Sequence, residues 1–255
     1  MILSKFALTD RVAIVTGSGR GIGKGIALGF AQAGAHVVGC ARTVEEIEAT
    51  ADEIRALGRK SLAIRTDVRE SEQVDDMVRK TVEEFGRIDI LVNNAGGLFV
   101  VAVLDMSERA WDAIIRENLK SVFLCSKAVA KVMVEQKKGS IVNIASMAGR
   151  TGSPGMAHYG AAKAGIINLT QSLSAEWAPY KIRVNAIAPG PVWTPGAAIV
   201  WPTPELQAKV VSRILLGRFG QPEDIAAAAI YLASDASDWV TGQTFDINGG
   251  PTIQV

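Results

Sequence analysis

The stretch Val12-Ala13-Ile14-Val15-Thr16-Gly17-Ser18-Gly19-Arg20-Gly21-Ile22-Gly23 decides the fold, because it joins an apolar strand to a helix through a glycine-rich turn. Val12–Thr16 is β-branched and apolar, and helical spacing runs from about Gly21 to Ala33. Glycines in such a turn let the backbone approach a pyrophosphate, and the helix N-terminus offers free N–H groups to the anion. We therefore predict a dinucleotide-binding turn that includes Gly17, Ser18, Arg20, Gly21, Ile22 and Gly23.

The spacing of these glycines distinguishes the turn from two better-known phosphate-binding turns. It is Gly17-x-x-x-Gly21-x-Gly23 with an additional Gly19, rather than G-x-G-x-x-G. Lys24 is followed by Gly25 and not by Ser or Thr, so the stretch is not a P-loop. A tight turn without a ligand is the alternative, but four glycines in seven residues between a strand and a helix favour dinucleotide binding.

Short β-branched runs alternate with helical patterns along the rest of the chain. Helices are predicted at Val44–Leu57 and Glu72–Phe85, and a long helix precedes each of the fifth and sixth strands. This alternation predicts the α/β class, as a Rossmann-type doubly wound parallel seven-stranded sheet with helices on both faces. No linker interrupts it, so residues 1–255 are interpreted as a single NAD(P)-binding domain. The further strands are expected at His36–Ala41, Ser61–Thr66, Ile88–Val92, Ile141–Ala145, Ile182–Ile187 and Thr244–Ile247.

Composition and charge exclude several classes of function. The net charge of +1 provides no general field for nucleic acid or an anionic membrane. Cys40 and Cys125 lie in apolar segments and match no metal-binding spacing, so we predict no metal site and a reducing compartment. Met1–Arg11 contains charges that a signal peptide would lack, and no apolar run approaches the ~18 residues of a membrane span. We expect a cytoplasmic protein without nucleic-acid or membrane partners.

The end of the second predicted strand bears on the choice of cofactor. NAD-selective folds usually place a carboxylate there, whereas this chain has Ala41 followed by Arg42. An arginine can pair with a 2′-phosphate through two hydrogen bonds, and Arg20 could approach the same phosphate. We predict a preference for NADP(H), with NAD(H) possible. The alternative is that Arg42 is a surface charge that pairs with Glu45 or Glu46.

Small and polar residues follow the third and fourth predicted strands. Asp67 and Val68 come where the adenine is expected, and Asn93 to Gly96 follow the fourth strand. Parallel sheets bind ligands at the carboxyl ends of their strands. We therefore expect contacts to the cofactor from these two segments, although ordinary turn chemistry would explain Asn93 and Asn94 if that motif stood alone. The predicted binding residues are Asp67, Val68, Asn94, Ala95 and Gly96.

Tyr159 and Lys163 form a Tyr-x-x-x-Lys step, and Ser146 lies thirteen residues before the tyrosine. Positions four apart share one face of a helix, so the ammonium can stabilise the phenolate and lower the tyrosine pKa from its usual ~10. A tyrosine altered in this way can exchange a proton with a carbonyl or an alcohol. Tyr and Lys also occur four apart by chance on solvated helices. His158 points to another face of the same helix and is interpreted as structural.

Together these motifs resemble the single-domain branch of the short-chain dehydrogenase/reductase family over about Asp10 to Gly250. The extended branch of that family has a different glycine spacing and a larger C-terminal lobe. The general pattern is most similar to 3-oxoacyl thioester reductases. Besides the segments above, the resemblance rests on Asn118, Ser146, Tyr159, Lys163, Pro189-Gly190-Pro191-Val192-Trp193-Thr194, Gly217–Asp224 and Thr241-Gly242-Gln243.

The resemblance implies an NADP(H)-dependent oxidoreductase that interconverts a ketone and a secondary alcohol. Tyr159 would be the general acid or base, and Ser146 would orient the substrate oxygen. Lys163 would hold the nicotinamide ribose and lower the tyrosine pKa, and Asn118 would hold a water that connects Lys163 to solvent. Both Tyr159 and Lys163 would thereby contact the cofactor. The nicotinamide would be clamped by the segment that includes Pro189, Gly190, Val192 and Thr194.

The substrate side is predicted to be apolar or mixed. The stretch Pro189 to Pro204 is rich in proline and is expected to be irregular, and a mobile lid is predicted at about residues 191–211. Tryptophans in the lid would pack on a bulky substrate, or alternatively within the lid or against another subunit. The expected apolar residues are Leu98, Phe99, Met147, Met156, Trp193 and Trp201.

The same motifs also suit other enzymes of this family and a binding protein without catalysis. Hydroxysteroid and sugar or polyol dehydrogenases share most of these motifs, while enoyl reduction fits less well because Ser146, Tyr159 and Lys163 suit carbonyl chemistry. A dinucleotide-binding sensor without catalysis would not need those three residues. The family resemblance implies a homotetramer, and apolar residues on two long helices would suit a helix-pair interface unless they face the sheet. Those residues are Phe123, Val129, Val132 and Met133, beside the helix Ala157–Trp177.

Overall fold

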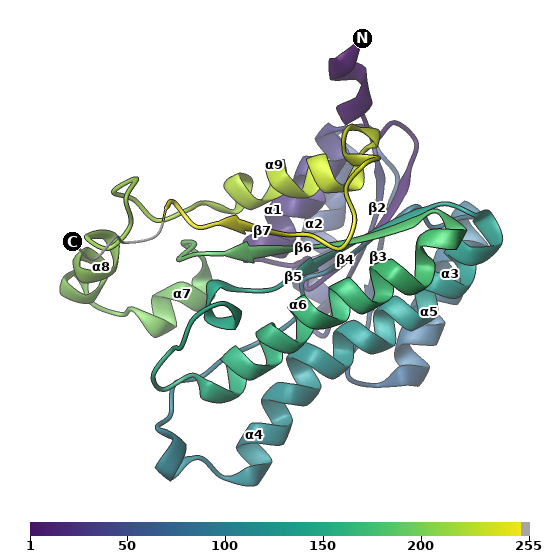
Figure 1. Cartoon of the computed structure of the whole chain (residues 1–255). Helices are drawn as coiled ribbons and strands as arrows, with labels where there is room; N and C mark the ends of the chain where they lie inside the picture. The colour runs from purple at the N-terminus through teal and green to yellow at the C-terminus, as the bar shows by residue number, and fades with distance from the viewer. Residues whose placement is uncertain (251–255) are drawn as a thin grey trace.

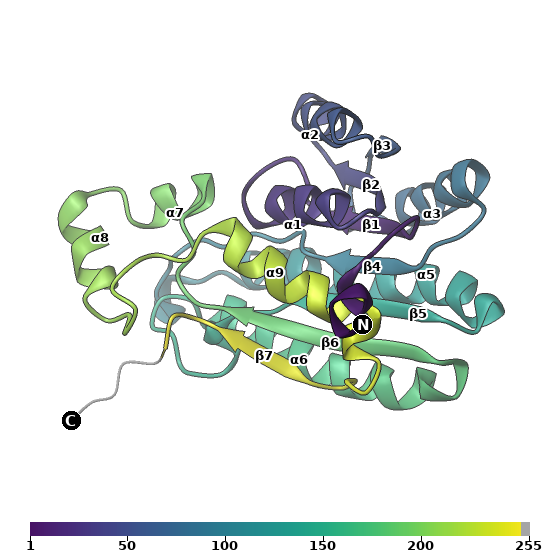
Figure 2. The ribbon, with the colours of Figure 1, turned by 90° about the horizontal axis from the view of Figure 1, so that it is seen from above.

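The computed structural model describes residues 1–250, which form a parallel sheet of seven strands (Figure 1, Figure 2). The strand order is β3-β2-β1-β4-β5-β6-β7, and each neighbouring pair runs parallel. The chain crosses from the edge strand β3 to β4 beside β1, so the strand order reverses there, and parallel sheets of this kind bind ligands at the carboxyl ends of the strands beside such a reversal. The strands are β1 (Val12–Thr16), β2 (His36–Ala41), β3 (Ser61–Arg65), β4 (Ile90–Asn93), β5 (Gly139–Ile144), β6 (Ile182–Pro189) and β7 (Thr244–Ile247).

Helices cover both faces of this sheet. Figure 1 shows α1, α2 and α9 above the sheet and α3, α5 and α6 below it. One apolar core lies on each face, with Phe30 fully buried in the first and Met133 fully buried in the second. The helices are α1 (Gly21–Gln32), α2 (Val44–Ala56), α3 (Ser71–Phe85), α4 (Glu108–Ile115), α5 (Ser121–Gln136), α6 (Ala157–Trp177), α7 (Pro195–Val200), α8 (Pro204–Val211) and α9 (Pro222–Ala233).

The predicted fold class and each predicted strand are confirmed, with shifts at the ends. β4 begins at Ile90 rather than Ile88 and continues through Asn93, while β6 continues through Pro189. Ile88 is nevertheless fully buried, because its side chain joins the lower core before the strand pairing begins. Strand ends are poorly marked in a sequence when apolar residues on either side of the boundary are buried alike.

The prediction that residues 189–204 are irregular is wrong in part. Two short helices, α7 and α8, form within or directly after this stretch. Each begins with proline at the first helical position. The N–H group that proline lacks would have no hydrogen-bond partner within the helix at that position, so the proline costs no bond. Thr194 and Thr203 precede them, and each side chain accepts a backbone N–H as an N-cap. The prolines therefore start helices here instead of preventing them.

A row of buried amides ties the middle strands together beneath their carboxyl ends. Asn93 of β4 faces Asn143 of β5 in register, and its Nδ2 donates to Asn143 Oδ1 at 2.8 Å and to Ser126 Oγ at 2.9 Å. Asn143 Nδ2 in turn donates to Thr170 Oγ1 at 2.9 Å. Turn chemistry, the sequence-based alternative for Asn93, is therefore wrong for this residue. The amides of Asn93 and Asn143 together connect β4, β5, α5 and α6.

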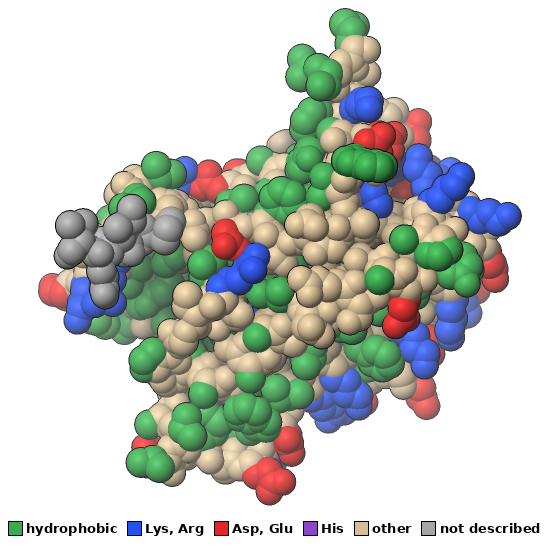
Figure 3. All heavy atoms as spheres, viewed as in Figure 1, with side chains coloured by type: hydrophobic (Ala, Val, Ile, Leu, Met, Phe, Trp, Pro, Cys, Tyr) green, Lys and Arg blue, Asp and Glu red, His purple; other side chains and the backbone are tan. Residues whose placement is uncertain are grey.

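The surface gathers hydrophobic side chains at the N-terminal turn and around α4 (Figure 3). Of the residues predicted for a helix-pair interface, Val129 and Met133 are fully buried in the lower core, and Val132 packs against it. Only Phe123 of that set is exposed, so the expected apolar stripe on α5 faces the sheet instead. Within residues 1–250, no helix is both long and apolar enough to cross a membrane. The exposed residues around α4 are Leu98, Phe99, Val100, Val103, Leu104 and Trp111.

Candidate functional site

The glycine-rich turn between β1 and α1 has backbone geometry that side chains would prevent. Gly17 and Gly21 have φ values of +65° and +56°, in the left-handed region that glycine adopts without strain. Gly23 has an ordinary φ, but a Cβ added there would overlap Gly17 O. These glycines therefore let the first turn of α1 fold back onto the end of β1. The N-terminus of α1 then meets the carboxyl edge of the sheet, as phosphate binding requires.

Thr16 and Asn94 fasten this turn to the loop that follows β4. Thr16 Oγ1 accepts the backbone N–H groups of Asn94 and Ala95, both at 2.9 Å. Asn94 Nδ2 donates to Thr16 O at 2.9 Å and to Gly17 O at 3.2 Å. Asn94 is thus placed by the structure at the predicted cofactor end, where it holds the turn. Thr16 was not among the predicted site residues, because a threonine at the end of a strand gives no distinctive signal.

Two arginines, each paired with a glutamate, lie near the glycine-rich turn and the end of β2. Arg42 pairs with Glu117 at 3.5 Å, and Arg20 pairs with Glu46 at 3.6 Å. The expected alternative, that Arg42 pairs with Glu45 or Glu46, is therefore wrong. Both arginine side chains remain more than half exposed, and such ion pairs are weak, so either can exchange its partner for a phosphate.

Asp67 and Val68 lie directly after β3, but Asp67 already has a partner. Arg69 donates to both of its carboxylate oxygens, at 2.6 to 3.1 Å. The Arg69 guanidinium holds the pKa of Asp67 below its usual range. The carboxylate is therefore ionised at neutral pH. Val68 is buried among the lower-core residues.

The structure brings Ser146, Tyr159 and Lys163 together beyond the end of β5. Ser146 follows the strand, and its Oγ accepts the backbone N–H of Ala148 at 3.1 Å. Lys163 Nζ donates to Ile144 O at 2.8 Å and lies 5.4 Å from the centre of the Tyr159 ring. The α6 helix thus places the phenol and the ammonium one turn apart, as the spacing predicted.

The electrostatics of this group differ from the sequence-based expectation. Burial lowers the pKa of Lys163 from 10.5 to about 8. Burial also raises the pKa of Tyr159 above its usual value, and a hydrogen bond with Ser146 opposes that shift. The expected lowering of the tyrosine pKa is therefore not present in the chain by itself, because desolvation outweighs the hydrogen bond with Ser146.

Asn118 lies between α4 and α5 in a π-helical turn, Arg116–Lys120 (η3). The wider turn directs its side chain inward, where Nδ2 donates to Gly97 O at 2.9 Å and to Ile114 O at 3.1 Å. Its buried Oδ1 has no partner within residues 1–250. A Cβ added to Gly96 would lie 2.5 Å from this oxygen and 3.8 Å from Lys163 Nζ. Asn118 and Lys163 therefore border one small space that only a glycine at position 96 leaves open.

The segment after β6 lies against the glycine-rich turn. A Cβ added to Gly21 would contact Thr194 at 3.2 Å, so Thr194 lies beside the glycine-rich turn. A Cβ added to Gly190 would lie 2.7 Å from Asn248 Cα, and Asn248 Nδ2 donates to Met147 Sδ at 3.4 Å. Asn248 thus supports both the loop after β6 and the loop after Ser146. Sequence reasoning missed it because it follows the last strand, far from either motif.

Two tryptophans predicted for the substrate pocket, Trp193 and Trp201, both pack against Phe219, which follows the lid segment in the chain. The ring of Phe219 lies 5.2 Å from that of Trp193 and 5.3 Å from that of Trp201, between ring centres. Val192 forms a bridge with Gly220, and Trp193 N donates to Gly220 O at 2.8 Å. The two rings therefore pack on the segment that follows the lid, rather than within residues 191–211 alone.

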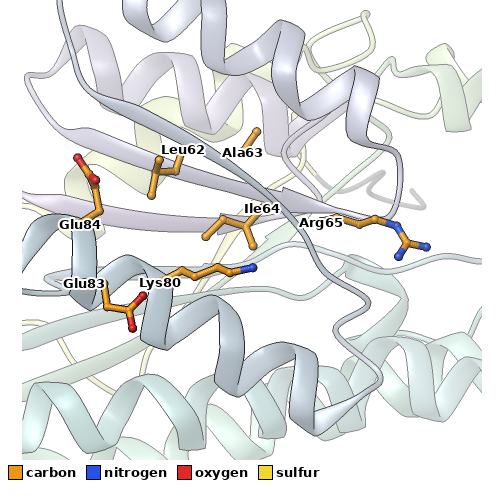
Figure 4. Close-up of a pocket in the computed structure, with 7 residues that line it drawn as sticks. All are labelled: Leu62, Ala63, Ile64, Arg65, Lys80, Glu83 and Glu84. Atoms are coloured by element: carbon orange, nitrogen blue, oxygen red, sulfur yellow. The ribbon is translucent and has the colours of Figure 1, made fainter.

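The hollows on the rest of the surface lie away from this site. One of about 440 Å³ lies between β3 and α3 (Figure 4). Figure 4 shows Lys80 extending along this gap and Arg65 pointing away from it. Lys80 is neutralised by Asp76 at 2.8 Å, and three strands separate β3 from β5. Another, of about 920 Å³, lies at the amino ends of the strands and includes Arg183. Neither contains a predicted catalytic residue.

Comparisons with known proteins agree with this geometry. A family model of the short-chain dehydrogenase type, described as enoyl-(acyl carrier protein) reductase, matches residues 17–252. A 3-oxoacyl-[acyl-carrier-protein] reductase from Synechocystis sp. is 43% identical over 247 residues, which cover 96% of this chain and 98% of that protein. A 2-dehydro-3-deoxy-D-gluconate 5-dehydrogenase from Escherichia coli is 42% identical over 251 residues, which cover 98% of each chain.

A solved structure is similar over nearly the same length. It is described as a candidate NAD(P)-dependent gluconate 5-dehydrogenase from Beutenbergia cavernae with bound NADP at low occupancy. It is 37% identical to this chain with a TM-score of 0.92, and the match covers 96% of this chain and 98% of that one. The likeness therefore extends to both the fold and the sequence.

The lowered pKa of Lys163 predicts a pH-dependent component of stability. Between pH 8 and pH 10.5 the unfolded chain binds more protons at this group than the folded chain, so the free energy of unfolding rises with pH. This one group contributes at most about 1.4 kcal/mol per pH unit. The buried thiols of Cys40 and Cys125 have raised pKa values and contribute the opposite slope over this range, so the rise due to Lys163 is measured as a difference from the unchanged protein. In urea denaturation between pH 8 and pH 9.5, below the range in which tyrosine titrates, we expect Lys163→Met to remove that rise.

The exposed Lys137 provides the matched control, because Lys137→Met deletes a lysine without removing a buried one. The control should keep the pH dependence of the unchanged protein. The same pH dependence in the Lys163→Met variant would show that the lysine is not desolvated as the structure indicates.

Proposed function

Because the chain belongs to the short-chain dehydrogenase/reductase family, we propose that it interconverts a ketone and a secondary alcohol with a nicotinamide dinucleotide as the hydride carrier. The observation that carries the proposal is the convergence of Ser146, Tyr159 and Lys163 beyond β5. They lie at the same sheet edge as the glycine-rich turn. A family description names enoyl reduction, but this set of residues supports proton exchange with a carbonyl oxygen.

The residues fit a dinucleotide at the carboxyl edge of the sheet. Gly17, Gly21 and Gly23 let the turn pack closely on its neighbours, so the start of α1 can offer its backbone N–H groups to a pyrophosphate. Asn118 Oδ1, which has no partner within residues 1–250, lies beside Lys163. When bound, the cofactor supplies or accepts the hydride. The proposed contacts to the cofactor are the residues predicted from the sequence. In the glycine-rich turn they are Gly17, Ser18, Arg20, Gly21, Ile22 and Gly23. In the rest of the chain they are Arg42, Asp67, Val68, Asn94, Ala95, Gly96, Tyr159, Lys163, Pro189, Gly190, Val192 and Thr194.

The chain's own residues would handle the proton. In reduction the Tyr159 hydroxyl gives its proton to the carbonyl oxygen, and in oxidation the tyrosine takes the proton from the alcohol. Ser146 Oγ donates a hydrogen bond to the same oxygen and fixes its orientation. Lys163, when protonated, stabilises the phenolate that results. Asn118 Oδ1 holds a water beside Lys163 through which the proton returns from solvent.

We further propose a preference for NADP(H) over NAD(H). Arg42 and Arg20 are the supporting residues, because both are exposed and held only by weak ion pairs near the glycine-rich turn and the end of β2. Each can offer two N–H groups to a 2′-phosphate. The bound NADP in the gluconate 5-dehydrogenase structure is consistent with this choice for a relative of similar sequence.

For the substrate, a 3-oxoacyl thioester is the first candidate, supported by the Synechocystis reductase. A sugar-derived keto acid is the second, supported by the Escherichia coli and Beutenbergia cavernae proteins. The carbonyl chemistry at Tyr159 would be the same for both. The segment at residues 191–211 is proposed as the lid over either substrate. The buried thiols of Cys40 and Cys125 support a reducing, cytoplasmic location.

The first experiment follows NADPH absorbance with purified protein and an acetoacetyl thioester. We expect consumption of NADPH, and Tyr159→Phe should lower kcat by at least about a hundredfold because the general acid is lost. The variant should still bind NADPH, as measured by its fluorescence. Substantial residual turnover in Tyr159→Phe would remove this residue from its proposed role. Failure with the thioester alone would move the search to the keto acids.

The cofactor preference is tested by KM values for NADPH and NADH. Arg42→Asp should raise the KM for NADPH about tenfold or more relative to that for NADH, because one charged hydrogen-bond partner of the phosphate is lost. Arg55→Asp, which changes an exposed arginine on α2, should leave the ratio unchanged. A lower KM for NADH than for NADPH in the unchanged protein would refute the preference.

We also propose that the chain assembles as a homotetramer. The apolar residues exposed around α4, among them Leu104 and Trp111, support an interface at this end of the molecule. Light scattering at micromolar concentration should give the mass of four chains. A monomer under those conditions would contradict the proposal.

A further inference from the structure

His158 is a buried side chain whose hydrogen-bonding groups the chain leaves unused. Its side chain is fully buried, and neither Nδ1 nor Nε2 has a partner within residues 1–250. Burial lowers the pKa of His158, so the ring is neutral at pH 7. A neutral imidazole has one N–H donor and one nitrogen acceptor, and burying either without a partner is unfavourable. The fold therefore carries an unmet donor and an unmet acceptor at this position.

His158 directly precedes Tyr159 in the first turn of α6. The loop after β4 passes both Lys163 and His158. The loop after β4 reaches Lys163 at Gly96, where an added Cβ would lie 3.8 Å from Nζ. Three residues later Phe99 lies edge-on against the His158 ring, with 4.6 Å between ring centres. Three residues span at most ~10 Å, so the backbone of Phe99, whose ring covers His158, lies within about that distance of the backbone of Gly96 beside Lys163.

The part of this loop that covers His158 is weakly held. Gly97 O accepts from Asn118 Nδ2, and Val101 N donates to Gly155 O at 2.9 Å. Between these two points, the backbone groups of residues 98–100 make no hydrogen bond to the rest of the described chain. The Phe99 side chain is itself 40% exposed. A ligand can therefore displace Phe99 without breaking a backbone hydrogen bond.

We propose that His158 is a specificity-determining residue that hydrogen-bonds a hydroxyl group on the carbon chain of the substrate. A hydroxyl both donates and accepts, so it matches both groups of the neutral ring, whereas a thioester oxygen only accepts. This inference rests on the proposed carbonyl chemistry and separates its two substrate classes. A sugar-derived keto acid offers the hydroxyl, while an unsubstituted 3-oxoacyl chain does not.

The experiment compares ketones that carry a hydroxyl one, two or three carbons from the carbonyl, each with the analogue that lacks the hydroxyl. With NADPH, kcat/KM for at least one hydroxylated ketone should exceed that for its analogue about tenfold or more, because the analogue leaves the ring unpaired. His158→Phe should bring this ratio to about one and change kcat/KM for the analogue by less than about twofold. His158→Asn, which keeps a donor and an acceptor, should keep part of the preference.

Thermal melting without substrate separates this role from a purely structural one. His158→Phe removes no hydrogen bond within the described chain, so its melting temperature should equal or exceed that of the unchanged protein. A clear drop in melting temperature, together with equal losses for both members of each ketone pair, would assign His158 a structural role. Turnover without a hydroxyl preference would refute this inference alone. No turnover of any ketone would refute the proposed reaction as well.

Discussion

The close approach of two backbone segments at the carboxyl edge of the sheet is the constraint on which the rest of the site depends. Gly23 comes so near Gly17 O that no other residue fits, and Asn94 bonds to Thr16 and Gly17 across the junction of β1 and β4. These contacts fix the N-terminus of α1 relative to the loop after β4. The same loop then passes Asn118 and Lys163, so one junction positions the phosphate end and the proton-transfer end together.

Desolvation dominates the electrostatics around Tyr159 and Lys163. Both Tyr159 and Lys163 have pKa values shifted toward their neutral forms, which is the opposite of what an isolated phenol beside an ammonium would show. Ser146 partly compensates at the tyrosine through a hydrogen bond. The protein thus places the pair in a region of low polarity, where any charge brought near it has a larger effect than it would in water.

A 3-oxoacyl thioester and a sugar-derived keto acid would need different side chains near Tyr159 and Lys163. Trp193 and Trp201 pack on Phe219, so the two tryptophans of the lid are engaged by the segment that follows it. The wall beyond Gly96 instead carries Phe99 over a buried imidazole. Apolar character alone would suit an acyl chain, whereas the unused polar groups of His158 favour a hydroxylated one. Specificity is therefore expected to reside in the loop after β4 as well as in the lid.

The sequence by itself determined the α/β class, the strands, the glycine-rich turn and the Tyr159–Lys163 pair, because each depends on residues close together in the chain. Periodicity and a fixed spacing of four record local geometry directly. Only the tertiary structure decided that Arg42 faces Glu117, that Asn248 supports Met147, and that burial raises the tyrosine pKa. Those outcomes depend on contacts between distant segments and on the exclusion of water, and neither leaves a pattern in neighbouring residues.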